Sequence, residues 1–140
     1  MDTRKYVQIG ISAIVLLILV VGVLQFMGGQ ISDETLPITA SVFIDFGNGT
    51  SLSFTNITTC NATVFGLLLE AAKMGNFSVK YTYYGEYDSM FVDSIAGVEN
   101  GKDNRWWQYY VNGEYGMVGA DKKPVKDGDI IEWKFEESQW

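Results

Sequence analysis

The chain has 140 residues, 47% of them hydrophobic, with 17 Asp and Glu against 10 Lys and Arg and a formal net charge of −7. It contains one Cys and no His. This excludes an internal disulfide, imidazole metal ligation and catalysis that depends on a His base. The acidic balance also argues against nucleic acid as a partner, because phosphates call for a basic surface.

The first element along the chain is an uncharged apolar segment at residues 7–27, in which 16 of 21 residues are hydrophobic. A helix of this length crosses the hydrocarbon core of a bilayer. Arg4 and Lys5 precede it, so the positive-inside bias predicts that residues 1–6 are cytoplasmic and that the rest of the chain is extracytoplasmic. A cleaved signal peptide is the alternative, but the segment is long and lacks an Ala-x-Ala site. We expect an uncleaved signal anchor and a single-pass cell-membrane protein.

Four N-x-[ST] sequons follow the apolar segment, at Asn48, Asn56, Asn61 and Asn76. Each sequon alone is a weak signal, because Asn and Thr are common in turns. About one is expected by chance from the residue counts, and four occur. Together they favour a glycosylated cell-surface domain.

The exposed part is predicted to consist of a short polar linker at residues 28–39 and one domain at residues 40–140. Alternating residues around Asn48-Gly49 predict a hairpin of strands 41–46 and 51–55. A helix is expected over 64–74, with Thr63 as its N-cap and Gly75-Asn76 as its stop. Further strands are expected at 77–84, 91–95, 106–111 and 130–135. This order predicts an α+β fold of β-grasp type, with a hairpin, one helix and a single mixed sheet, in addition to the transmembrane helix.

Several motifs occur in order along this domain: Val64-Phe65-x-x-Leu68, Phe91-Val92-x-x-Ile95-x-Gly97, Trp106-Trp107-x-Tyr109-Tyr110-Val111-Asn112-Gly113, Gly119-Ala120 and Asp127-Gly128-Asp129-Ile130-Ile131-Glu132-Trp133. Together they resemble the transcobalamin C-terminal-like family, a domain of largely unknown function on bacterial and archaeal surface proteins. In the animal cobalamin carriers of this family, the β-grasp-like domain closes over cobalamin held against a helical barrel. Nothing of that barrel's size precedes residue 40 here. The resemblance therefore implies the fold, with cobalamin or another corrinoid as a candidate ligand.

Alternation along the strand at 106–111 places Trp107, Tyr109 and Val111 on one face and Trp106, Gln108 and Tyr110 on the other. The apolar set is expected to pack on the helix, and Trp107 and Trp133 are expected in the core. Trp106, Tyr110 and Tyr115 are predicted to form an exposed aromatic platform. The resemblance implies that Trp107-Gln108 and the loop 112–119 approach the ligand. The candidate ligand-binding residues are Trp106, Gln108, Tyr110, Asn112 and Tyr115.

No nucleophile–base pair, metal cluster or phosphate loop can be assembled from the sequence, so we expect no enzyme and no metal site. Asp127-Gly128-Asp129 offers too few ligands for a calcium loop and is expected to be a turn. Cys60 is either buried or available for an intermolecular bridge, and burial is favoured. The sequence thus predicts a noncatalytic binding module for a small ligand. An assembly subunit that docks another surface or membrane protein is the alternative.

Overall fold

The computed structural model describes residues 35–140, so the predicted anchor at 7–27 and most of the predicted linker lie outside the described residues. The chain divides into two units, Met1–Thr35 and Leu36–Trp140, and the second contains all the elements below. Among residues 35–140, no helix is long and apolar enough to cross a membrane.

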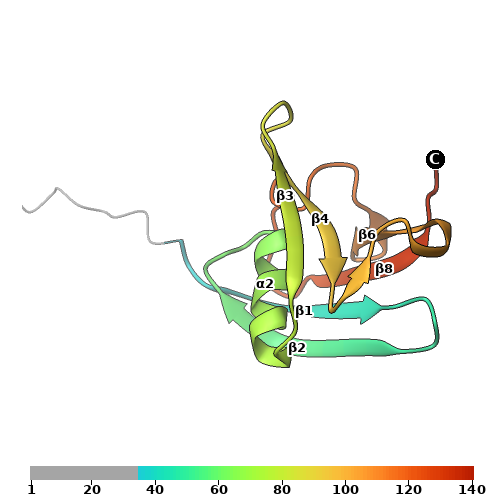
Figure 1. Ribbon diagram of the computed structural model, residues 1–140. Coiled ribbons are helices and arrows are strands. Elements are labelled where there is room, and N and C mark those ends of the chain that lie inside the picture. Colours follow the sequence, from blue (N-terminus) through green and yellow to red (C-terminus); the bar gives the residue numbers. More distant parts are fainter. Residues whose placement is uncertain (1–34) are drawn as a thin grey trace, which may run out of the picture. The chain divides into compact units, whose positions relative to one another are not determined.

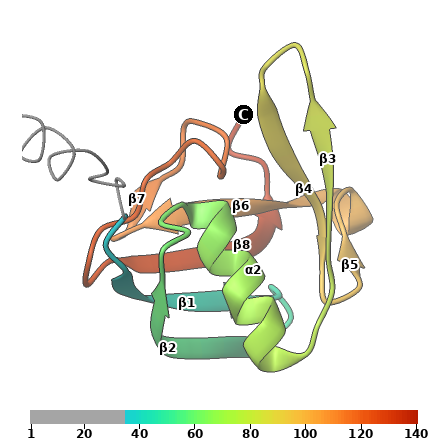
Figure 2. The same cartoon turned by 90° about the vertical axis from the view of Figure 1, so that its left-hand side faces the viewer.

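Two separate sheets form the domain, where the sequence predicted one. The larger is mixed and has the order β2 (Ser51–Thr59), β1 (Ile38–Asp45), β8 (Ile130–Glu137), β6 (Arg105–Val111) and β7 (Glu114–Tyr115). The smaller is antiparallel and has the order β3 (Val79–Tyr84), β4 (Ser89–Ile95) and β5 (Val98–Glu99). A 3₁₀ turn, η1 (Lys102–Asn104), leads into β6. Figures 1 and 2 show that α2 (Val64–Gly75) crosses one face of the larger sheet, while the β3–β4 hairpin projects beyond it.

The β1–β2 hairpin confirms the prediction made from alternation and the Asn-Gly turn. Asn48 Oδ1 accepts a hydrogen bond from Thr50 N–H at 3.0 Å, which closes the turn locally. The register shifts by one residue near Ala40, where Asn56 adopts a φ of 57° on the opposite strand. This bulge lets β2 follow the twist of β1 and leaves β2 as an edge of the larger sheet.

Helix α2 begins and ends where its capping residues predict. Thr63 Oγ1 accepts a hydrogen bond from Gly66 N–H at 3.0 Å, and the left-handed Asn76 donates its N–H to the Ala72 carbonyl. Leu67 and Leu68 are fully buried, and each contributes about 1.5–3 kcal/mol relative to an exposed position. The apolar face of α2 therefore fixes the helix on the sheet.

The core lies between α2 and the larger sheet. Its sheet side is provided by residues that alternate along β1, β6 and β8, among them Ile44, Trp107 and Trp133. Trp107 is 6% exposed and Trp133 is 3% exposed, so both predicted core tryptophans are confirmed. Val92 and Ile95 of β4 belong to the same core, which holds the smaller sheet against the larger one.

Candidate functional site

A pocket of about 150 Å³ lies between β4 and β6. Its walls include three consecutive residues of each strand, 90–92 and 107–109. Consecutive side chains point to opposite faces of a sheet, so a pocket lined by all three must lie against the edge of the strand. The two sheets therefore face each other edge to edge here. The pocket occupies the space in which hydrogen bonds between β4 and β6 would join the two sheets into one. The segment 115–120 and Trp133 complete the lining.

The backbone of β6 presents unpaired groups to this space. β7 pairs only with Tyr110 and Val111, so the preceding part of the edge has no strand partner in the described domain. Trp107 N–H donates to Asn100 Oδ1 at 2.7 Å, and the Tyr109 carbonyl accepts from Gly116 N–H at 2.9 Å. In an antiparallel strand, the N–H and C=O of one residue point to the same edge. The Trp107 carbonyl and the Tyr109 N–H hence point toward the pocket, and within residues 35–140 neither is engaged by a strand paired to this edge or by a turn hydrogen bond.

The side chain of Asn100 bridges the two sheet edges beside the pocket. Its Nδ2 donates to the Val92 carbonyl of β4 at 2.8 Å, while its Oδ1 accepts from Trp107 N–H of β6 at 2.7 Å. These backbone partners also fix which end of the amide is oxygen and which is nitrogen. One carboxamide thus joins strands that do not pair directly.

Aromatic rings form the inner wall of the pocket. The Tyr109 and Trp133 ring centroids are 5.5 Å apart, and the Tyr109 hydroxyl donates to the Val118 carbonyl at 2.6 Å. Burial raises the pKa of Tyr109 above the ordinary value of 10.0. Gln108 Oε1 and Trp133 Nε1 are buried without a hydrogen-bond partner among the described residues. Both residues line the pocket, whose inner wall is mainly aromatic.

Two glycines allow the segment 115–120 to approach the strands closely. A Cβ at Gly116 would lie 2.1 Å from the Tyr109 ring, and one at Gly119 would lie 1.9 Å from Ser89 Oγ. Both distances are far below van der Waals contact, so any side chain here would displace the pocket wall. Asp121 then ties the segment to β4 by accepting from Met90 N–H at 3.0 Å.

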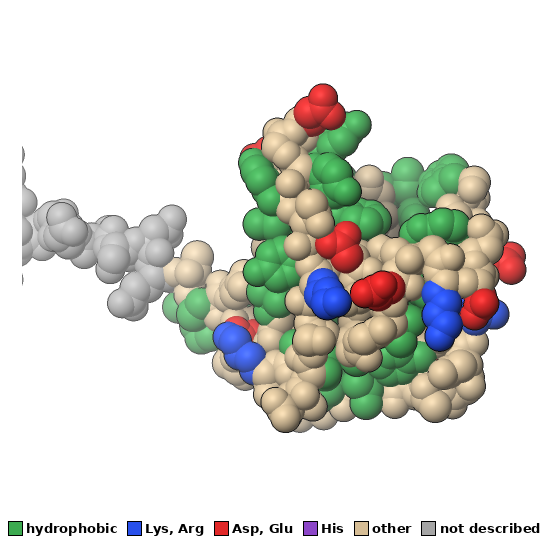
Figure 3. All heavy atoms as spheres, in the orientation of Figure 1, with side chains coloured by type: hydrophobic (Ala, Val, Ile, Leu, Met, Phe, Trp, Pro, Cys, Tyr) green, Lys and Arg blue, Asp and Glu red, His purple; other side chains and the backbone are tan. Residues whose placement is uncertain are grey.

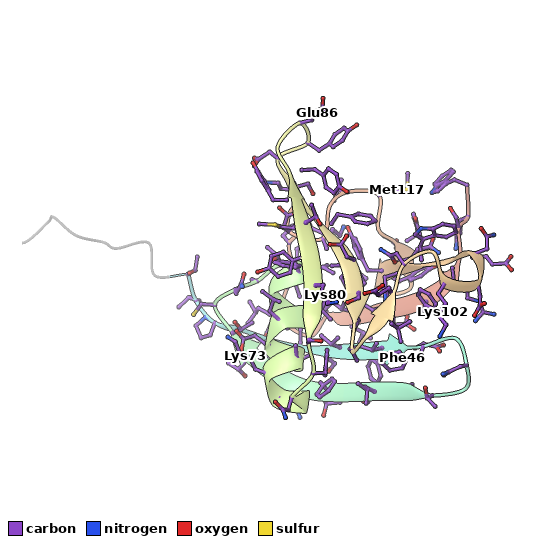
Figure 4. The ribbon with its side chains drawn as sticks, in the orientation of Figure 1. Phe46, Lys73, Lys80, Glu86, Lys102 and Met117 are labelled. Atoms are coloured by element: carbon purple, nitrogen blue, oxygen red, sulfur yellow. The ribbon has the colours of Figure 1, made fainter. Side chains whose placement is uncertain are left out.

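Exposed aromatic residues occur on both faces of the projecting β3–β4 hairpin (Figures 3 and 4). Its exposed aromatic residues are Tyr81, Tyr83, Tyr84, Tyr87 and Phe91, and the exposed Met117 and Val118 lie on the segment 115–120. Figure 4 shows Glu86 at the tip of the hairpin and Met117 on a separate loop beside it.

Polar contacts near the tip order the hairpin. Tyr83 donates its hydroxyl to Asp88 Oδ1 at 2.9 Å, and Lys122 Nζ lies 3.2 Å from Asp88 Oδ2. The hydrogen bond to Asp88 raises the pKa of Tyr83, whereas the bonds from Tyr83 and Lys122 lower the pKa of Asp88. The hairpin is thereby attached to the segment that closes the pocket.

The structure brings together only part of the predicted site. Gln108 and Tyr115 line the pocket, but Trp106, Tyr110 and Asn112 do not. Asn112 is a left-handed turn residue whose side chain accepts from Ile130 N–H at 2.9 Å and donates to Asp129 at 2.9 Å. Asp129 belongs to a separate turn, in which its N–H donates to the Lys126 carbonyl at 3.1 Å, as expected of the Asp127–Asp129 stretch.

The predicted exposed aromatic platform is wrong in one respect, because Trp106, Tyr110 and Tyr115 are half-buried. Residues that follow β8 cover part of this face. Gln139 Nε2 donates to the Tyr110 hydroxyl at 2.7 Å, and the Trp140 ring centroid is 6.3 Å from that of Tyr115. Burial, followed by the hydrogen bond to Glu136, raises the pKa of Tyr110 to about 12. Contacts with the last residues of the chain therefore occupy the face on which the platform was expected.

Sequence reasoning missed the residues that shape the pocket, chiefly Asn100, Met90 and the segment 118–120. Gly119-Ala120 was noted as a family motif, and its close approach to β4 is the physical reason for the glycine. Nothing in the sequence indicated the role of Asn100, because that role depends on the placement of β4 beside β6, two strands that do not pair. Cys60 is exposed, so its predicted burial is wrong.

The four sequon asparagines are exposed and lie away from the pocket, on the β1–β2 hairpin, after β2 and at the end of α2. Their glycosylation stays a prediction. Within the described range, no group of three Asp, Glu, Cys or His is placed to hold a metal ion.

Together these features define a small α+β domain whose two sheets enclose a pocket with unpaired backbone groups. The chain belongs to the family described as "Domain of unknown function (DUF4430)", whose model matches residues 61–137 and so includes every pocket residue. None of the curated proteins matches the chain.

Two solved structures are similar in fold. Haptocorrin in complex with Cbi is 19% identical with a TM-score of 0.64, covering 74% of this chain and 26% of its own. A protein of Ruminococcus gnavus ATCC 29149, named as a candidate metal-binding protein, is 24% identical with a TM-score of 0.57, covering 72% of this chain and 98% of its own. The chain thus spans about a quarter of haptocorrin, and the likeness agrees with a transcobalamin-like fold.

Proposed function

We propose that this protein is a noncatalytic binding module that holds part of a small ligand in the pocket between β4 and β6. The observation that carries the proposal is the pair of unpaired backbone groups, the Trp107 carbonyl and the Tyr109 N–H, in an otherwise apolar pocket. Apolar walls with a few placed polar groups are typical of small-molecule sites. A ligand that pairs with these groups recovers the cost of leaving them unsatisfied, about 1–3 kcal/mol each.

A corrinoid is the candidate ligand within this proposal. It is supported by the transcobalamin-like resemblance and by the fold shared with haptocorrin, whose structure contains Cbi. The pocket volume limits how such a ligand binds, because about 150 Å³ holds a group the size of benzene. A corrin macrocycle is much larger. Only a side arm would enter the pocket, and the ring would stay outside it, against exposed residues of the pocket mouth such as Val118.

The test is a titration of the full-length chain, in detergent, with cobalamin and with a corrinoid that lacks the lower base. Heat release and the visible spectrum report binding. Val118→Trp should weaken binding by filling the mouth of the pocket. Met117→Trp adds the same ring at an exposed neighbouring position and should not. No response up to about 1 mM corrinoid, which corresponds to a binding free energy near 4 kcal/mol, would refute the assignment.

We also propose that residues 7–27 anchor the protein in the cell membrane with the domain at residues 40–140 outside, and that the sequons carry glycans. The apolar segment, the preceding Arg4 and Lys5, and the four exposed sequon asparagines support this topology. Protease added to intact cells should remove the domain, and protection would contradict the proposal. We propose in addition that the domain has a fold of β-grasp type. It is supported by the parallel pairing of β1 with β8 beside a single helix.

A protein-interaction or assembly role is the second candidate, and the exposed aromatic hairpin favours it. Tyr84 and Phe91 share one face of the hairpin, with ring centroids 6.1 Å apart, and exposed apolar groups gathered on one face mark interaction sites. Tyr87 is 75% exposed and Tyr83 is 55% exposed, both near the hairpin tip. Crosslinking in intact membranes should capture a partner subunit, and Tyr87→Ser should reduce the yield. Recovery of the monomer alone would count against this role.

A further inference from the structure

Beside the edge of β6 there are two places where a carboxamide can pair with the backbone. The Asn100 side chain occupies the first, and the second is open. At the first, Asn100 accepts from Trp107 N–H at 2.7 Å and extends its own N–H₂ to the Val92 carbonyl at 2.8 Å. At the second, one step further along β6, the Trp107 carbonyl and the Tyr109 N–H point into the pocket, and within residues 35–140 no paired strand or turn hydrogen bond engages them. The protein thus shows how a carboxamide oxygen accepts from a backbone N–H of this edge, and beside it the edge offers both an N–H and a carbonyl.

We propose that the open position recognises a primary carboxamide of the ligand. The ligand oxygen accepts from Tyr109 N–H, and its nitrogen donates to the Trp107 carbonyl. This inference rests on the proposed function, because it names the group that enters the pocket.

The lining of the pocket disfavours a carboxylate or another anion. It contains no Lys or Arg, and the Trp107 carbonyl would face a carboxylate with no proton between them. Asp121, which binds β4 through Met90 N–H at 3.0 Å, adds a negative charge nearby. An anion would therefore be desolvated without a compensating cation. A neutral amide supplies both the donor and the acceptor that the edge requires.

The size of the pocket distinguishes a side arm from a peptide strand. An added strand would need a continuous open edge on both flanks. Here Asn100 closes the edge on one side, and β7 closes it on the other by pairing from Tyr110 onward. The free stretch is limited to residues 107–109, and the volume of about 150 Å³ accommodates one short amide arm.

The experiment uses the ¹⁵N-labelled full-length chain in detergent micelles, with propionamide as the probe. Propionamide should shift the backbone amide signal of Tyr109 in a saturable way. N,N-dimethylpropionamide lacks the N–H and should bind about tenfold more weakly, as should propionate. Val118→Trp should abolish the response, while Met117→Trp, which leaves the pocket mouth open, should preserve it. Equal responses to propionamide and its dimethyl derivative, or an unmoved Tyr109 signal, would overturn the inference.

Its failure can be told apart from that of the proposed function. A corrinoid that binds at the Val118-dependent site, without competition from propionamide, would refute carboxamide recognition and leave the binding module standing. A propionamide response without corrinoid binding would support carboxamide recognition and refute the corrinoid assignment. If neither propionamide nor a corrinoid binds, carboxamide recognition and the proposed function are both refuted.

Discussion

The bridge formed by Asn100 gives a sharp prediction about stability. Asn100→Ala removes two hydrogen bonds at once, from Nδ2 to the Val92 carbonyl and from Trp107 N–H to Oδ1. Val92 and Trp107 are 5% and 6% exposed, so water reaches the abandoned backbone groups poorly. The substitution should therefore destabilise the domain much more than an ordinary surface change.

The magnitude follows from those two bonds. Each contributes about 1 kcal/mol net, and leaving a buried partner unpaired raises the loss to about 1–3 kcal/mol per group. We expect a total of about 2–6 kcal/mol. For a domain of about this size, each kcal/mol shifts the melting temperature by roughly 4–8 °C, so Asn100→Ala should melt at least about 8 °C lower.

Urea unfolding followed by tryptophan fluorescence measures this effect. All four tryptophans lie in the described domain, so their signal reports on it alone. Glu86→Ala, at the exposed hairpin tip, is the control and should change stability by less than about 0.5 kcal/mol. A loss for Asn100→Ala as small as that of the control would refute the idea that this side chain joins the two sheets.

Three further predictions concern the pocket, the C-terminal contacts and the topology. Gly116→Ala should cost about 1–3 kcal/mol and abolish the propionamide response, because its Cβ would lie 2.1 Å from the Tyr109 ring; an unchanged urea midpoint would contradict this. The pKa of Tyr110 is raised from 10.0 to about 12, so its contribution to stability is complete below pH 10 and is lost as the pH rises toward 12. Over that pH range, the melting temperature of Tyr110→Phe should accordingly fall less than that of the unchanged protein. Equal falls for the two proteins would refute the raised pKa of Tyr110. The exposed Cys60 should react with a membrane-impermeant maleimide on intact cells, and labelling only after lysis would reverse the proposed orientation.

Local patterns in the sequence predicted most of the elements. The hairpin around Asn48 and the helix bounded by Thr63 and Asn76 depend on turn and capping chemistry within a few residues, and both formed as expected. The two-residue strands β5 and β7 went unpredicted, because strands so short lack a measurable alternation. The split into two sheets could not be predicted either, since it depends on which strand edges pair in the folded domain.

The candidate site was predicted less well, for a physical reason. Alternation assigned faces to β6 correctly, with Trp107 and Tyr109 toward the core. The pocket, however, lies along the edge of the strand, and whether that edge is open depends on contacts that alternation does not reveal, such as those of Asn100 and Gly116. Contacts from Gln139 and Trp140 then cover the face that the sequence suggested.

The parallel pairing of β1 with β8 also has a consequence for folding. The first and last strands of the domain meet inside the larger sheet, with β2 on one side and β6 on the other. Such a pairing must close a loop that spans nearly the whole domain, which slows folding relative to local contacts. During synthesis, β1 lacks its second neighbouring strand until Ile130–Glu137 has emerged. A chain truncated before β8 therefore loses the centre of its sheet rather than an edge, and should be recovered as an aggregation-prone fragment.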